Sequence, residues 1–117
     1  MLNDSDEKRL LDLAREIKKL DKEMVKRYVE GKEYGELEEK FINMKQEIAK
    51  IVSRSNGPIK LYDSEAARTL IKLRDGKLSF VEKLHERFLK LFNAWANGKL
   101  KLDEESELKR VFSEIQK

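Results

Sequence analysis

The sequence predicts an all-α protein: a single helical bundle of about five helices over residues 1–117, with an N-terminal antiparallel αα-hairpin packed on three further helices. Three observations lead to this fold class. Apolar residues recur at three- and four-residue steps through most of the chain. Only one Pro and five Gly are present, and they stand in short breaks between the periodic stretches. A chain of 117 residues also suits one domain with one core.

The first two helices are expected to form the hairpin. The first is predicted from about residue 6 to about residue 30, with Ser5 or Asp6 as the N-cap and Gly31 as the stop. Its apolar stripe comprises Leu10, Leu13, Ala14, Ile17, Leu20, Met24 and Tyr28. The second helix is predicted from about residue 36 to residue 53, with a seam at Leu37, Phe41, Met44, Ile48 and Ile51. We expect this seam to pack on the first helix; the alternative is that it receives a helix from another chain.

Three more helices are expected after the break at residues 53–58. The third is predicted over residues 64–74, with Asp63 or Ser64 as its cap. A central helix is predicted over residues 80–97 and is followed by Gly98, a typical helix-ending residue. The last helix is predicted over residues 103–115. The central helix carries Phe80, Phe88, Phe92 and Trp95, and their helical spacing on an apolar face predicts that they lie in the core.

The composition excludes several classes of protein. Charged residues make up 42% of the chain, against about 25% in an average domain. A chain rich in Lys and Glu that has no Cys is typical of hyperthermophile proteins, so we expect a thermophile source. The lack of Cys excludes disulfides and thiolate metal sites. No apolar run is long enough to span a membrane, and the first residues are polar and acidic, so we expect a cytoplasmic protein that contacts no membrane.

No pattern in the sequence predicts catalysis. Glu82 and His85 have the Glu-x-x-His spacing of helical di-iron proteins, but such sites need two copies, and His85 is the sole His of the chain. No Ser is placed for a triad with this His, and the Gly residues form no phosphate-binding loop. We therefore predict that the protein is not an enzyme and has neither a metal site nor a cofactor.

The positive charge of the chain is concentrated in one segment. The net charge is +3, yet residues 54–101 hold eleven basic and five acidic residues, whereas the remaining segments are neutral or slightly acidic. The first helix has a basic row at Arg15, Lys19, Lys22 and Lys26. The pairs Asp12–Arg15, Glu16–Lys19 and Glu23–Lys26 are expected to neutralise this row largely from within the helix.

Two basic rows in this segment predict a contact surface for phosphates. Arg68 and Lys72 form one line on the third helix; Lys83, Arg87 and Lys90 form another on the central helix. Lys and Arg neutralise the phosphates of any sequence and release counterions. The predicted nucleic-acid-binding residues are Arg54, Lys60, Arg68, Lys72, Lys83, Arg87 and Lys90. The alternative is that these side chains only form a solvated face.

One of the two basic rows lies on a helix that is rich in Phe and Trp. With this pattern the chain resembles the small helical subunits of CRISPR RNA-guided effector complexes, which belong to antiviral defence. The resemblance implies a subunit that lines the path of the guide or of the displaced target strand beside neighbouring copies. We therefore expect a non-catalytic structural subunit of a nucleoprotein assembly, which contacts nucleic acid and other protein subunits and can self-associate. The alternative is a protein–protein adaptor or regulator that uses its helical hairpin and binds no nucleic acid.

Overall fold

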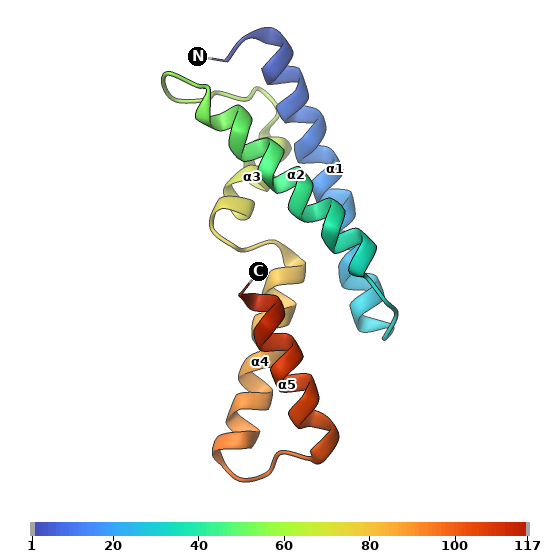
Figure 1. The fold of residues 1–117 in the computed structure, drawn as a ribbon. Helices are drawn as coiled ribbons and strands as arrows, with labels where there is room; N and C mark the ends of the chain where they lie inside the picture. The colour runs from blue at the N-terminus through green and yellow to red at the C-terminus, as the bar shows by residue number, and fades with distance from the viewer. Residues whose placement is uncertain (1, 117) are drawn as a thin grey trace. The chain divides into compact units, whose positions relative to one another are not determined.

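The structure is a computed structural model that describes residues 2–116, and those residues form five α-helices and no strand. The helices are α1 (Asp4–Val29), α2 (Gly35–Ser53), α3 (Ser64–Arg74), α4 (Ser79–Ala96) and α5 (Leu102–Ile115) (Figure 1). The all-α class, the number of helices and the N-terminal hairpin with a further helix packed on it are confirmed. The contacts divide the chain into an N-terminal unit, residues 1–78, and a C-terminal unit, residues 79–117. That the chain is one domain stays a prediction.

The N-terminal unit is built on α1, which packs against both α2 and α3. The stripe of α1 faces inward, and its buried members are Leu10, Leu13, Ala14, Ile17 and Met24. The seam of α2 packs on α1 as predicted, with Leu37, Phe41, Ile48 and Ile51 buried. Three ion pairs join the N-terminal hairpin along its length: Arg9 with Glu47, Arg27 with Glu36, and Arg54 with Asp6.

The start of α1 differs from the prediction. Asn3, which has an extended backbone, is the N-cap: its Oδ1 accepts a hydrogen bond of 2.7 Å from the backbone N–H of Asp6. The predicted caps, Ser5 and Asp6, lie inside the first turn. The earlier start places three acidic side chains in the first turn, where they interact favourably with the helix dipole. The predicted cap of α3 is correct, because Asp63 accepts hydrogen bonds from two backbone N–H groups of the first turn.

The C-terminal unit is a second hairpin, in which α4 packs against α5. Its buried side chains are Phe80, Leu84 and Leu91 on α4 and Val111 on α5. After α4 the chain turns at Gly98, whose φ of +66° is a left-handed conformation that favours glycine.

The aromatic residues of α4 do not all lie in the core. Phe80 is buried, but Phe92 is 44% and Trp95 58% exposed. Their rings continue a row in which successive centroids lie 5.7 Å apart, from Trp95 through Phe92 and Phe88 to Phe112 of α5. The expectation that all four aromatics of α4 lie in the core was wrong, because the apolar arc of α4 is wider than the strip that α5 covers.

Candidate nucleic-acid interface

The seven residues predicted to bind nucleic acid fall into both units of the chain. Arg54, Lys60, Arg68 and Lys72 belong to the N-terminal unit. Lys83, Arg87 and Lys90 belong to the C-terminal unit, on α4. The two groups have different surroundings, which decide how much of their charge is available to a ligand.

Arg54 and Lys60 lie beside the acidic first turn of α1. The Nη1 of Arg54 is 3.0 Å from Oδ1 of Asp6. Lys60, in the connection between α2 and α3, shares a surface hollow with Asp4 and Glu7. Carboxylates this close repel phosphates and compete for the two cations, so this part of the predicted surface is weakly suited to a polyanion.

Arg68 and Lys72 are exposed one turn apart on α3. The Nε of Arg68 donates a hydrogen bond of 3.3 Å to the backbone oxygen of Ser64. Among the described residues, no acidic side chain forms an ion pair with Lys72. This row keeps its positive charge available to a ligand.

The row on α4 is partly occupied by acidic residues of α5. The Nε and Nη2 of Arg87 donate to the two carboxylate oxygens of Glu107 at 2.6 and 2.8 Å, and Glu104 lies 3.9 Å away. This bidentate bond holds the pKa of Glu107 below its usual value. Lys83 lies 3.8 Å from Glu86. Arg87 therefore joins α4 to α5, and its guanidinium is already engaged with carboxylates.

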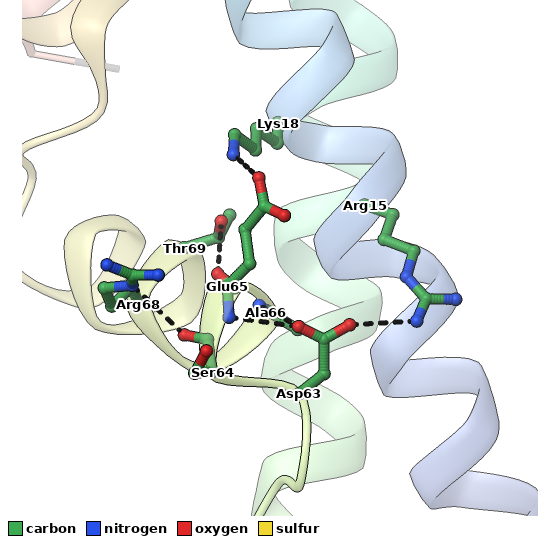
Figure 2. Close-up of polar contacts among 8 residues, drawn as sticks. All are labelled: Arg15, Lys18, Asp63, Ser64, Glu65, Ala66, Arg68 and Thr69. Carbon is green, nitrogen blue, oxygen red and sulfur yellow. Dashed lines mark hydrogen bonds and ion pairs between the residues drawn. The ribbon is translucent and has the colours of Figure 1, made fainter.

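The structure brings together a basic cluster that the charge count along the sequence does not reveal. A cleft of about 260 Å³ runs between α1 and α3. Arg15, Lys18, Lys19 and Lys22 of α1 line one side of it, and Asp63, Glu65 and Thr69 line the other. We refer to it as the basic cleft; Figure 2 shows the polar contacts of Arg15 and Lys18 with Asp63 and Glu65.

Asp63 has two roles at the start of the basic cleft. Its Oδ2 accepts a hydrogen bond of 2.9 Å from Nη2 of Arg15. Its Oδ1 accepts from the backbone N–H groups of Glu65 and Ala66 at 3.0 and 3.1 Å. The Arg15 bond, followed by the backbone bonds, lowers the pKa of Asp63, so this carboxylate is ionised at neutral pH.

The second pair of the basic cleft joins Lys18 to Glu65, whose pKa the Lys18 ammonium lowers. Thr69 turns its hydroxyl inward to the backbone oxygen of Glu65, at 3.0 Å. Figure 2 shows both acids of α3 directed toward α1, with Arg68 on the side of α3 away from Arg15. Asp63 and Glu65 thus form ion pairs with only two of the four cations, although Lys22 also helps to lower the pKa of Glu65 through its charge.

Lys19 and Lys22 are the unpaired cations of the basic cleft: across residues 2–116 neither forms an ion pair. None of the three ion pairs expected within α1 forms among the described residues, although the pKa of Arg15, which the hydrogen bond with Asp63 raises most, is also raised by the charge of Asp12. Arg15 bonds to Asp63 instead of Asp12, and the acidic side of the third expected pair, Glu23, bonds to Arg27. The reason for the first and third pairs is competition, because Asp63 engages Arg15, and Arg27, four positions along the helix from Glu23, engages that acid.

This arrangement suits anions that carry several charges. Two ammonium groups without an ion pair among the described residues lie in one cleft beside Arg15 and Lys18, whose carboxylate partners are half-buried (Asp63) and exposed (Glu65). Exposed ion pairs of this kind are weak, about 0–1 kcal/mol in general. A row of phosphates can therefore replace the carboxylates on Arg15 and Lys18 while it binds Lys19 and Lys22.

The described part of the chain contains no group of three His, Asp or Glu side chains placed to hold a metal ion. His85 is exposed on α4. None of the helices described has the length and apolar character needed to cross a membrane.

Comparison with known proteins identifies no relative: no family model, no curated protein and no solved structure matches the chain.

Proposed function

We propose that the chain is a non-catalytic structural subunit of a larger nucleoprotein assembly, and that its N-terminal unit contacts the backbone of nucleic acid through the basic cleft. The observation that supports this most is the pair of unpaired cations, Lys19 and Lys22, in a cleft lined by two further cations. A CRISPR effector, which the resemblance of the sequence implies, is one form of such an assembly.

The contact is with the backbone and not with the bases. The described side chains of the basic cleft are four cations, two carboxylates, two alanines and a Thr whose hydroxyl is bonded to its own helix. Cations of this kind position a nucleic acid by its phosphates, while sequence is read by groups aimed at base edges. We therefore expect similar affinity for unrelated sequences and strong dependence on salt.

Binding of short labelled oligonucleotides at low salt tests this function. Fluorescence anisotropy is measured with single-stranded RNA, single-stranded DNA and duplex DNA, each in two unrelated sequences. We expect binding that is similar for the two sequences of each kind. Absence of binding to every probe at low salt contradicts the proposal.

A second candidate function is a protein–protein adaptor or regulator, favoured by the exposed aromatic row on α4 and α5. Exposed apolar surface of this kind marks sites of protein interaction. The two candidates differ in the oligonucleotide experiment, since an adaptor of this type binds none of the probes. They also differ in the surface used, because the row shares no residue with the basic cleft.

A further inference from the structure

The N-terminal unit contains an apolar groove that its own helices leave open. Both α2 and α3 pack on α1, but within the described residues they do not pack on each other. The space between them is a groove of about 520 Å³ with Leu10 of α1 among its lining residues. Three helices packed in this way resemble a four-helix bundle from which one helix is missing.

The lining of this groove is aliphatic. Ile48, Ala49 and Val52 contribute from α2, and Ala67, Leu70 and Ile71 contribute from α3. The connection between the helices adds Ile59 and Leu61. Val52 is 43% and Ile71 49% exposed, so the groove opens to solvent with apolar side chains at its edges. Exposed apolar surface in a concave site indicates a binding partner.

We propose that this groove binds an amphipathic helix of a partner protein, with the apolar face of that helix inside the groove and its acidic flanks against Lys45 and Arg74. The lining residues of each wall lie within eight positions, 45–52 on α2 and 67–74 on α3. Eight positions span seven steps along a helix, which make about two turns, about 10 Å long. A partner helix therefore inserts apolar side chains at i, i+3 or i+4, and i+7.

Charge at the groove selects the partner. Lys45 and Arg74 belong to its lining. Lys45 forms no ion pair with any described residue, and Arg74 pairs with its exposed neighbour Asp75, at 3.0 Å. A second copy of the chain that packs groove against groove is a poor occupant, because the cations Lys45 and Arg74 of one groove then face the same cations of the other. Acidic flanks on a different helix are complementary to both cations.

This binding site is independent of the basic cleft. The groove uses Ala67, Leu70 and Ile71 of α3, whereas the cleft uses Glu65, Ala66 and Thr69. Failure of one proposal therefore leaves the other standing, and a variant in one site provides a control for the other.

A synthetic helical peptide tests the groove. The probe has Leu at two-turn spacing with Glu on both flanks, and a matched peptide has Lys in place of Glu. Binding is followed by the methyl resonances of the Ile residues. We expect the Glu peptide to shift the resonances of Ile48, Ile59 and Ile71, and to leave those of Ile17 and Ile115 unchanged. The Lys peptide is expected to bind several-fold more weakly.

Two kinds of variant define the site. Val52→Asp and Ile71→Asp place a carboxylate at the apolar edges and are expected to weaken the binding of the Glu peptide about tenfold each. Lys45→Glu, at an exposed position, is expected to remove most of the preference between the peptides, because Arg74 is then the remaining cation of the groove lining. Leu89→Asp on α4, an exposed apolar position outside the groove, is the control and leaves affinity unchanged.

Several results overturn the proposal. One is that no Ile methyl resonance shifts at millimolar peptide. Others are that the two peptides bind equally well, or that the resonance of Ile115 alone shifts. A further one is self-association of the wild-type chain that Val52→Asp abolishes, because a second copy is then the occupant. The proposal is also contradicted if the Lys45→Glu variant still prefers the Glu peptide to the Lys peptide as strongly as the wild-type chain does. This variant leaves the apolar lining of the groove unchanged.

Discussion

Asp63 and Arg15, 48 positions apart in the chain, are joined by a hydrogen bond of 2.9 Å between Oδ2 and Nη2. The same carboxylate caps α3 through its other oxygen. One side chain thus starts α3, ties it to α1 and partly neutralises the basic cleft. Its cap and its charge can be separated experimentally, because Asn caps a helix as well as Asp does.

Asp63→Asn is expected to strengthen the binding of oligonucleotides. Asn keeps the cap of α3 but removes a negative charge that competes with phosphates for Arg15. Loss of one exposed pair of this kind corresponds to about a twofold to fivefold gain in affinity at low salt. Anisotropy titrations measure this gain. Asp63→Ala is the companion variant: it removes the charge and the cap, so it lowers the melting temperature where Asn does not. Weaker binding by Asp63→Asn contradicts the competition.

The ion pair between Arg87 and Glu107 predicts acid sensitivity of the C-terminal unit. The pKa of Glu107 is lower in the folded state than its ordinary value of 4.5. The stability that the pair contributes is therefore complete above pH 4.5 and is lost as the pH falls through the folded pKa. We expect Glu107→Gln to be less stable than the wild type at pH 7 and to show a smaller loss between about pH 5 and pH 3. Urea denaturation at both pH values measures this, and equal acid sensitivity of the two proteins contradicts it.

The basic row on α4 is expected to matter less than the basic cleft. Arg87 is held by Glu107 and Glu104. The row on α4 therefore offers phosphates only its two lysines, Lys83 and Lys90. Lys83→Glu with Lys90→Glu should reduce oligonucleotide affinity only as much as Lys40→Glu with Lys50→Glu, a double reversal on exposed positions of α2. A much larger loss in the α4 variant instead supports the row predicted from the sequence.

Burial of Leu13 predicts a large contribution to stability. Leu13 is 0% exposed in the middle of the α1 stripe, whereas Val29, at the end of the same helix, is 68% exposed. Leu13→Ala is expected to lower the free energy of unfolding by about 2–5 kcal/mol, and Val29→Ala to change it by less than about 0.5 kcal/mol. Chemical denaturation followed by circular dichroism compares them. Similar losses in the two variants mean that α1 is packed differently.

The helices and the hairpin core could be predicted because their signals are local. Leu10, Leu13 and Ile17 repeat at helical spacing, and all three are fully buried. Exposure of Phe92 and Trp95 could not be predicted in the same way. Helical spacing shows that these aromatics share the apolar side of α4, but how much of that side α5 covers is a property of tertiary packing.

The basic cleft could not be found from segment charges, for two physical reasons. A charge count along a segment adds Lys19 and Lys22 to Asp12, Glu16 and Glu23 and gives a net charge near zero. These acids, however, stand on a different line of α1 from the two lysines. The partners of Arg15 and Lys18 come from α3, more than forty positions away, and no local pattern predicts them. Helical spacing does show the basic row on α1, but it does not show that the acids of the same helix leave Lys19 and Lys22 without an ion pair among the described residues.

The dependence of oligonucleotide affinity on salt tests the central claim most directly. Lys19→Glu with Lys22→Glu is compared with Lys40→Glu with Lys50→Glu, which changes the net charge by the same amount. We expect the cleft variant to weaken binding to unrelated sequences alike. It should also flatten the slope of log K against log salt by about 1.4 for single strands, because each phosphate that is no longer neutralised removes about 0.7 from the slope. The α2 variant is expected to keep the wild-type slope. Equal slopes in the two variants would contradict binding through the basic cleft.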